Sequence, residues 1–394
     1  MYTSMMRKAL FGSGDTATLS LDFSAGTVPT AVTFTRADST ARATYIDANG
    51  YVKTVTAAGD ARFDYTGGVA KGLLIEQSAI NLLLNGKRIH VSLGGWFFGG
   101  SGTTVTTPDY STGPDGVSSS ATRLQLSQNC SLKQVAGTIN TNHTASVWAK
   151  SNDSNSYNLA FWTGSTGSAK VITPQWQRFE SVINFSATPA FDFYKNDAGI
   201  CDISVWGAQV ELGSNATSTI PTVASSLTRL ADDAVISSTA WTGLYSKPGT
   251  IVVEYYRGEY GAGDRSVLAI DTAITKHIHL KHANGSAASG IYNSAGSGVA
   301  NKAAGNASGL NKACFSWSSA NPSTIKYALN GNATVVSGSS DIGATLGTWM
   351  TIGSASTTGV SGSGTWEGYL NNCIKSVKYY SELLSDADMI AKTT

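Results

Sequence analysis

The sequence predicts an all-β protein made of several sandwich or jelly-roll domains. Apolar and polar residues alternate with a period of two in segments such as 250–256 and 374–380, as they do in half-buried strands. Glycine accounts for 42 of the 394 residues and charged residues for only 13%, which favours short strands, tight turns and a surface of hydroxyl and amide groups. Dipeptides that supply the positive φ angles of hairpin turns, Asn-Gly or Asp-Gly, lie at 49–50, 115–116, 284–285 and 330–331.

One helix is predicted, at the C-terminal end over residues 385–392. Ser385 suits the N-cap and Asp388 occupies the third helical position, as in a capping box. Acidic side chains in the first turn also favour the positive end of the helix dipole. The rest of the chain shows almost no helical periodicity, so we expect this helix to be an appendage to β domains.

Length, charge and hydropathy exclude several classes of protein. A chain of 394 residues exceeds one hydrophobic core and predicts about two or three domains. The net charge is +1 and no lysine- or arginine-rich run occurs, so we expect no nucleic-acid partner. No apolar run approaches the roughly 20 residues that cross a bilayer. The N-terminal stretch also lacks the apolar centre of a secretory signal, so no membrane partner is expected.

Four cysteines lie far apart, at Cys130, Cys201, Cys314 and Cys373. Their spacing excludes the common zinc patterns, in which cysteine or histidine ligands come in close pairs. We predict buried free thiols, because free cysteine is among the most buried residue types. The alternative is a Cys130–Cys201 or a Cys314–Cys373 disulfide, since each pair falls inside one predicted domain. No metal and no organic cofactor is expected.

Composition divides the chain into three segments. We expect an N-terminal segment over residues 1–84, a second domain over 85–223 and a third over 224–394. The second boundary follows a Ser/Thr-rich stretch at 214–222 that contains Pro221. Such a stretch is typical of a linker or of a crossing between sheets.

The N-terminal segment contains an ordered series of motifs. The series reads TFTRADST at 33–40, ATYIDANG at 43–50, ARFDY at 61–65 and GLLIEQSAINLL at 72–83. It resembles a block of phage-encoded structural proteins, including tail fibres, head fibres and prophage minor structural proteins. Gln77 stands where an acid is common in that block, and Ile80 where arginine or threonine is common. The TRAD motif is echoed by TRLAD at 228–232, which we interpret as the start of a second domain rather than as a repeat.

The later segments resemble two carbohydrate-binding folds. Three stretches resemble parts of a carbohydrate-binding-module jelly roll: ASVWAK at 145–150, WQRFE at 176–180 and CDISVWGAQVELG at 201–213. Four later stretches resemble parts of a concanavalin A-like or laminin G-like sandwich: GTIVVEYY at 249–256, YALNG at 327–331, MTIGS at 350–354 and WEGYL at 366–370. These resemblances imply an N-terminal extended or β attachment segment, a jelly roll, and a concanavalin A-like sandwich that ends in the short helix.

The resemblances together imply a bacteriophage virion protein, a fibre or spike subunit of the head or tail. Residues 1–84 would attach it to other virion proteins, and its lectin-like domains would adhere to bacterial surface polysaccharide. It would be made in the host cytoplasm and carried on the particle surface. A homotrimer is expected, because repeated weak sites gain avidity from effective concentration. The alternatives are a purely structural capsid-decoration or tail-baseplate protein, and a polysaccharide depolymerase.

The carboxylates argue against the depolymerase. Glycoside hydrolysis needs two carboxyl groups roughly 5–10 Å apart. Glu254 and Glu259 flank a turn-like Arg-Gly, and the adjacent Asp232 and Asp233 would face opposite sides of a strand. The chain also contains no clustered ExDxxE-like pattern and no Gly-x-Ser-x-Gly elbow. We therefore expect no enzyme activity and assign no catalytic residue.

Histidines offer one candidate metal site. His277 and His279 share one face of a predicted strand, and together with His282 they could hold an ion. They precede a predicted turn at 284–285 within a sandwich strand. That context favours a solvated or inter-subunit histidine face, so no metal ligand is assigned.

Aromatic side chains carry the predicted carbohydrate-binding site, because they offer flat apolar faces with polar edges. The three aromatic residues at 96–98 lie between two Gly-Gly dipeptides, a context typical of an exposed loop. The predicted site residues are Trp96, Phe97, Trp162, Tyr260 and Asp264. For Trp96 and Tyr260 the alternative is packing at a domain or subunit interface. The tryptophans expected in the core are Trp148, Trp176, Trp206 and Trp366.

Overall fold

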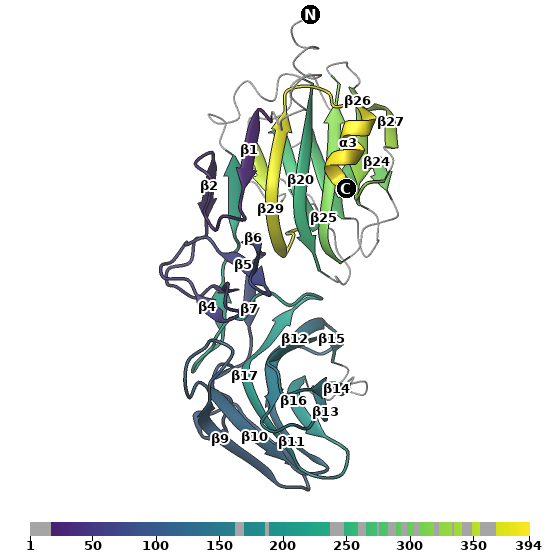
Figure 1. The fold of residues 1–394 in the computed structure, drawn as a ribbon. Helices are drawn as coiled ribbons and strands as arrows, with labels where there is room; N and C mark the ends of the chain where they lie inside the picture. Colours follow the sequence, from purple (N-terminus) through teal and green to yellow (C-terminus); the bar gives the residue numbers. More distant parts are fainter. Residues whose placement is uncertain are drawn as a thin grey trace, which may run out of the picture.

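The chain folds into two stacked bodies joined by a group of short strands (Figure 1). Nearly every regular element is a strand, which confirms the all-β prediction. The computed structural model describes residues 17–161, 169–185, 189–236, 248–258, 265–273, 276–282, 289–292, 298–302, 308–318, 323–332, 335–340, 349–354 and 368–394.

The upper body in Figure 1, which we call the large sandwich, consists of two antiparallel sheets. One sheet has the order β27 (Val335–Ser340), β26 (Ser323–Leu329), β25 (Gly309–Trp317), β20 (Gly249–Arg257), β29 (Asn372–Tyr380), β6 (Val69–Ile75) and β5 (Phe63–Thr66), with β1 (Leu19–Asp22) also paired to β29. The other has the order β2 (Val32–Thr35), β19 (Asp233–Ile236), β28 (Trp349–Ile352), β21 (Arg265–Ala273), β22 (Lys276–His282), β23 (Ser289–Tyr292) and β24 (Gly298–Lys302).

The lower body, which we call the small sandwich, consists of two five-stranded sheets. One has the order β15 (Gln177–Asn184), β12 (Asn142–Ser151), β17 (Cys201–Leu212), β10 (Ala121–Leu126) and β9 (Thr104–Ser111). The other has the order β14 (Ala169–Ile172), β13 (Tyr157–Phe161), β16 (Ala190–Lys195), β11 (Cys130–Val135) and β8 (Phe97–Gly100). The region predicted as a jelly roll is thus a sandwich whose sheets use only strands from residues 97–212.

Residues 17–84, which we expected to stand apart as an N-terminal segment, instead contribute strands to the large sandwich. Its strand β1 pairs with β29 and its strand β2 with β19, so it joins both sheets. Between the two bodies lie the short strands β3 (Thr44–Ile46), β4 (Val52–Thr54), β7 (Ala79–Asn81) and β18 (Leu227–Arg229). The 3-10 turn η1 (Val91–Leu93) belongs to the small sandwich, where Val91 packs against the buried core. The chain therefore starts in the large sandwich, builds the small one and then returns to complete the large one.

Each sandwich has its own apolar core. In the large sandwich, alternate residues of β20 such as Ile251 and Val253 are fully buried against the opposite sheet. The outward-facing Val252 is also buried, because it packs with Met389 of the C-terminal helix α3 (Asp386–Thr393). In Figure 1 this helix covers the outer face of the sheet. The small sandwich has a separate buried cluster that includes Leu132, Val147 and neighbours from both of its sheets.

Local sequence signals explain the ends of several elements. The predicted helix is confirmed, and the Ser385 hydroxyl accepts a hydrogen bond from the Asp388 N–H at 3.2 Å. Asn330 and Gly331 have φ angles of 48° and 70°, as a hairpin turn with two left-handed residues requires. All four cysteines are buried and free, so the prediction of free thiols is confirmed over the disulfide alternatives.

Replacing Gly72 by alanine is expected to destabilise the large sandwich strongly. Gly72 has a φ of 108°, and an added Cβ would meet the carbonyl oxygen of Ile374 and lie 2.7 Å from the Cα of Lys375 on β29. Because the obstacle is backbone, β29 would have to move, at a cost above about 2 kcal/mol. Gly50→Ala is the control, since Gly50 has a φ of 82° with nothing within 4 Å. Denaturant midpoints that fall equally in both variants would contradict this explanation.

Candidate functional site

Six charged side chains form one buried ionic network between the two bodies. Each side chain is 4% exposed or less. The members of the network are Arg36, Asp38, Arg62, Glu76, Arg229 and Asp232. Four belong to the motif block at 33–83 and two to its echo at 228–232, so the structure brings the two similar segments together.

Asp232 and Arg62 lie at the centre of the ionic network. The Asp232 carboxylate accepts hydrogen bonds from Arg36 Nη1 at 2.9 Å, from Arg62 Nη2, and from the Glu76 backbone N–H at 2.9 Å. Arg62 Nη1 also donates to the Glu76 carboxylate at 2.6 Å, which Arg229 approaches at 3.5 Å. Each arginine is therefore matched by an acid, as buried charges require.

The ionic network also holds the segment that leaves the small sandwich. The Ser218 N–H donates to the Glu76 carboxylate at 2.6 Å, and the Ser218 hydroxyl donates to it at 2.7 Å. Nearby, the Thr44 hydroxyl donates to the Thr219 carbonyl at 2.5 Å, and Asn81 donates to the Ile220 carbonyl at 2.9 Å. Residues 218–220 of the predicted linker at 214–222 are therefore tied to Glu76 and to the short strands β3 and β7.

Burial alone would raise the pKa of Glu76, because it penalises the charged carboxylate. Arg62, Arg229 and the hydrogen bonds from Ser218 outweigh that effect and hold the pKa at about 2. The glutamate is thus fixed as an anion that cannot exchange a proton near neutral pH. The hydrogen bonds from Ser218 to Glu76 therefore connect the motif residues to the segment that leaves the small sandwich.

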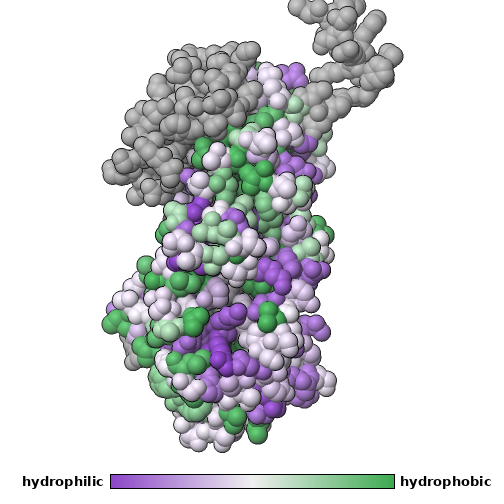
Figure 2. Space-filling view, turned by 90° about the vertical axis from the view of Figure 1, so that its left-hand side faces the viewer, coloured by the Kyte–Doolittle hydropathy of each residue, from purple (hydrophilic) through white to green (hydrophobic). Residues whose placement is uncertain are grey.

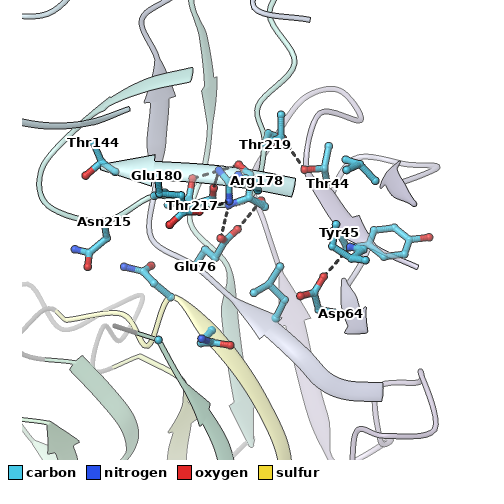
Figure 3. A pocket seen from close by; sticks show the side chains of 18 of the residues that line it. Thr44, Tyr45, Asp64, Glu76, Thr144, Arg178, Glu180, Asn215, Thr217 and Thr219 are labelled. Atoms are coloured by element: carbon cyan, nitrogen blue, oxygen red, sulfur yellow. Dashed lines mark hydrogen bonds and ion pairs between the residues drawn. The ribbon is translucent and has the colours of Figure 1, made fainter. Parts of the chain in front are cut away.

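A cleft of about 650 Å³ opens beside the ionic network, between the two bodies. Its walls come from β3 to β6 on one side and from β12 and β15 of the small sandwich on the other, with the 214–219 segment and Asn371 between them. Figure 3 shows Arg178, Thr217 and Glu76 near the centre of the cleft, with Tyr45 and Asp64 to one side and Asn215 to the other. A volume of this size is typical of small-molecule sites.

The charged side chains of the cleft are paired with one another. Arg178 lies 2.9 Å from Glu180, and Lys71 lies 3.5 Å from Asp64. Burial raises the pKa of Asp64, while Lys71 and the hydrogen bond from the Ile46 N–H lower it, and the net direction is upward. The cleft therefore has local dipoles but no large excess of either charge.

Trp148 and Tyr45 give the cleft an aromatic component. Trp148 is half-buried, and its Nε1 donates to the Thr219 hydroxyl at 3.2 Å. Beside it, Trp206 is 2% exposed and packs with Val52 and Ala121. We expected both tryptophans in the core; Trp206 lies there, whereas Trp148 also contributes to the wall of the cleft.

The structure corrects the sequence interpretation of Trp96 as an exposed-loop residue. Trp96 is 3% exposed, its Nε1 donates to the Leu84 carbonyl at 3.1 Å, and its ring packs edge-on against Phe191. Gly94 and Gly95 both have positive φ angles, so they turn the chain and direct the indole inward instead of forming a flexible loop. Trp96 thus packs in the core of the small sandwich, and neither in an exposed loop nor at the domain or subunit interface that was the alternative.

The other predicted site residues do not form a common site in the described part of the chain. Phe97 is 42% exposed on β8, where Lys133 Nζ lies 5.3 Å from the centre of its ring. Trp162, Tyr260 and Asp264 lie outside the described residues. Sequence reasoning missed the cleft, because Arg178, Asn215 and their neighbours meet only through the pairing of the two bodies. The WQRFE motif and the polar 214–222 stretch were the only local signals.

The surface outside the cleft is mixed in character. Figure 2 shows hydrophilic and hydrophobic side chains interspersed, with a hydrophilic concentration on the small sandwich. On the outward side of β10 and β17, Arg123 pairs with Asp202 and stacks on the exposed Tyr110 ring at 4.8 Å. Arg123 is therefore already paired with groups of its own surface.

The described residues contain no group of three or more histidine, cysteine, aspartate or glutamate side chains that could hold a metal ion. The backbone of β22 places His277 opposite Asp271 and His279 opposite Ala269. Within the described ranges, no helix is long and apolar enough to cross a membrane.

No family model matches the chain, and no curated protein matches it. Among solved structures, the CBM40 carbohydrate-binding module of the Ruminococcus gnavus IT-sialidase, bound to α2,3-sialyllactose, is 18% identical with a TM-score of 0.28 over 39% of this chain and 87% of that one. The leech intramolecular trans-sialidase is 20% identical with a TM-score of 0.29, over 39% of this chain and 24% of that one. The tandem CBM22 domains of Paenibacillus barcinonensis Xyn10C are 10% identical with a TM-score of 0.24, over 77% of this chain and 100% of that one. At these TM-scores the likenesses assign neither a family nor a ligand to this chain.

Proposed function

We propose that the chain is a bacteriophage virion subunit, a fibre or spike protein of the head or tail that adheres to bacterial surface glycan. The support for the virion role is the ordered motif series between residues 33 and 83, which resembles a block of phage structural proteins. In this proposal the protein is a homotrimer, is carried on the particle surface, and attaches to other virion proteins through residues 1–84. Trimerisation would multiply weak sites through effective concentration.

The cleft between the two bodies carries the glycan part of the proposal. It combines cationic, anionic and amide side chains with the indole of Trp148 in a volume of about 650 Å³. Sugars present hydroxyl groups that both donate and accept hydrogen bonds, together with apolar ring faces. A concave site that mixes aromatic faces with a few placed polar groups suits such ligands.

We propose that binding is not followed by cleavage. The carboxylates lining the cleft are each held by other groups: Asp64 by Lys71 and the Ile46 N–H, Glu180 by Arg178, and Glu76 within the ionic network. A glycosidase needs one carboxyl group free to give a proton and a second on the other side of the scissile bond. The cation pairing in the cleft supports a role in recognition and not in hydrolysis.

The full-length chain is expected to bind a subset of bacterial surface polysaccharides and the cells that carry them. Binding of labelled protein to a panel of strains would be measured by flow cytometry, with purified surface polysaccharide as competitor. Polysaccharide length after prolonged incubation, measured by size-exclusion chromatography, is expected to stay unchanged. Binding to none of the strains and to none of the polysaccharides would contradict the adhesion role. Shortening of the polymer would contradict the non-catalytic role.

A purely structural virion role is the second candidate, and the buried ionic network favours it. The motif residues that resemble phage structural proteins clamp the two bodies together, as a load-carrying particle component would require. Electron microscopy of the particle distinguishes the two roles. An adhesin leaves the cleft open to solvent, whereas a decoration protein without binding activity would have it covered by neighbouring subunits.

A further inference from the structure

Three aromatic rings, each with a cation beside it, surround the turn at 112–120 that joins β9 to β10. The pairs, with the distance from the cation to the ring centre, are Lys53 with Tyr51 at 5.0 Å, Arg123 with Tyr110 at 4.8 Å and Lys150 with Trp176 at 5.4 Å. All three distances lie within the range of cation–π attraction. We call these six side chains the aromatic–cation surface. None of the six lines the cleft between the two bodies.

Hydrogen bonds to the turn bring the three pairs together. On β4, Lys53 donates through Nζ to the Asp115 carbonyl at 2.9 Å. Just before β15, Trp176 donates through Nε1 to the Thr112 carbonyl at 3.2 Å. Tyr110 belongs to β9 itself, close to the start of the turn. Three segments that are far apart in the sequence therefore meet at this turn.

Strand register places two of the cations on one face of the small sandwich. Ser204 on β17 lies opposite Arg123 on β10 and opposite Lys150 on β12. Residues that lie opposite one another on neighbouring strands point to the same face. The two cations therefore flank Ser204, about 10 Å apart across two strand spacings. The Ser204 hydroxyl lies 2.8 Å from the Ser111 hydroxyl, which connects this face to the end of β9.

The aromatic–cation surface is open to solvent. Tyr51 is 42% exposed and Tyr110 is 44% exposed, and the Arg123 side chain is 29% exposed. The other three members are half-buried. Figure 2 faces the left-hand side of Figure 1, where β9 lies, and shows a concentration of hydrophilic side chains on the small sandwich. A ligand in solution can therefore reach the rings and the cations from outside.

Two of the three cations form no ion pair with a carboxylate of the described residues. Lys53 instead contacts a backbone carbonyl, and Lys150 contacts an aromatic ring. Asp47, in the same hairpin as Lys53, directs its carboxylate to backbone N–H groups. The cations around the turn that do have acidic partners are Arg123 with Asp202, Lys87 with Asp115 at 3.6 Å and Arg88 with Asp109. The two lysines are therefore available to an anion from solution.

Sugars that carry a carboxylate on the ring match this arrangement. In a uronic acid, the charge and the apolar C–H face of the ring belong to one unit. An aromatic side chain offers a flat apolar face for the ring, and a lysine beside it offers an ammonium group for the carboxylate. A phosphodiester polymer of open-chain polyols has the charge but no such ring. The pairing of each lysine with a ring therefore favours the uronic acid.

Building on the proposed function, we propose that the aromatic–cation surface binds acidic glycan through units that carry a carboxylate on the sugar ring. Lys150 and Trp176 bind one such unit, and Lys53 and Tyr51 bind another. A polysaccharide with repeated uronic acids thus crosses the turn between β9 and β10. This second site selects acidic over neutral units of the surface glycan.

The test is calorimetric titration of the full-length chain with matched probes. The acidic probes are oligomers of galacturonic, glucuronic and mannuronic acid, and the neutral probes are their methyl esters, which keep the ring and lose the charge. At least one acidic probe is expected to bind, with its ester at least about tenfold weaker, because the ester loses two exposed charge pairs. Added salt should weaken the acidic probe, since exposed charges are screened. Poly(glycerol phosphate) should bind more weakly than the acidic probe.

Matched variants place the ligand on the aromatic–cation surface. Lys53→Gln and Lys150→Gln are each expected to weaken the acidic probe about threefold to fivefold, the range for one exposed charge pair. Lys53→Arg and Lys150→Arg keep the charge and should retain most of the binding. Lys133→Gln is the control, because Lys133 lies 5.3 Å from the Phe97 ring on the other sheet of the small sandwich. Unchanged denaturant midpoints confirm that a lost affinity is not a loss of fold.

The outcomes overturn the two proposals separately. Acidic binding that both Lys53→Gln and Lys150→Gln leave unchanged would show that the glycan binds elsewhere. Equal binding of an acidic probe and its ester, or tighter binding of poly(glycerol phosphate), would show that the ligand class is wrong. If no acidic probe binds while cells are still bound in a polysaccharide-competed manner, this inference alone is overturned. If cells are not bound either, the adhesion role is overturned as well.

Discussion

Replacing Asp232 by alanine is expected to lower the free energy of unfolding by about 3–5 kcal/mol, the usual cost of removing one partner from a buried ion pair. The side chain is fully buried and accepts hydrogen bonds from Arg36, Arg62 and the Glu76 N–H. Its loss leaves the guanidinium groups in excess over carboxylates in a region that water does not reach. Chemical denaturation, followed by tryptophan fluorescence, measures the change.

Asp109→Asn is the matched control for Asp232→Ala. Asp109 pairs with Arg88 on the surface, where the two side chains are 45% and 48% exposed. Exposed pairs contribute about 0–1 kcal/mol, and asparagine tolerates the φ of 56° at this position. A comparable loss in both variants would contradict the role assigned to burial. So would an Asp232→Ala protein that keeps the parent stability.

Much of the fold could be predicted because its signals are local. The period-two pattern at 250–256 predicts a strand, and the structure has β20 there, buried on both faces. Ser385 identifies the helix start because capping depends on neighbours within one turn. The Asn330-Gly331 turn was predictable for the same reason, since its φ angles are a property of those two residues.

The arrangement of the N-terminal segment could not be predicted, because it depends on pairing over long sequence separations. Leu19 of β1 lies opposite Tyr379 of β29, and nothing in either strand specifies the other. The similarity of residues 228–232 to the TRAD motif could be seen in the sequence, but the contact between the two segments could not. Arg36 and Asp232 are 196 positions apart, and their contact follows from the chain's return to the large sandwich.

The candidate site illustrates the same limit. Trp96 was conspicuous between glycine pairs, yet those glycines turn it into the core. Asn215 and Asn371 have no local feature that separates them from other asparagines in a polar chain. They become informative only when the two bodies place them on the walls of one cleft. A site built between domains therefore has to be found from the structure and not from sequence motifs.

Acid is expected to destabilise the protein through Glu76, between about pH 4.5 and pH 2. The pKa of Glu76 is about 2 in the folded chain, against 4.5 for an ordinary glutamate. The unfolded state therefore takes up a proton in this window while the folded state does not. The stabilising contribution is fully present above pH about 4.5 and disappears as the pH falls towards 2, amounting to about 3 kcal/mol.

Comparison with Glu76→Gln isolates this effect. The pKa values of Asp64 and Glu211 are raised chiefly by burial, so these groups act in the opposite direction. The Glu211 contribution cancels from the difference, whereas Asp64 loses in the variant the smaller upward contribution that the Glu76 charge makes to its pKa. The parent chain should be the more stable one at neutral pH, and the gap should narrow steadily below pH 4.5. Glu382→Gln, at an exposed position, should instead give a curve parallel to the parent. A gap between the parent and Glu76→Gln that stays constant from pH 7 to pH 2.5 would mean that Glu76 is not held ionised by the arginines around it.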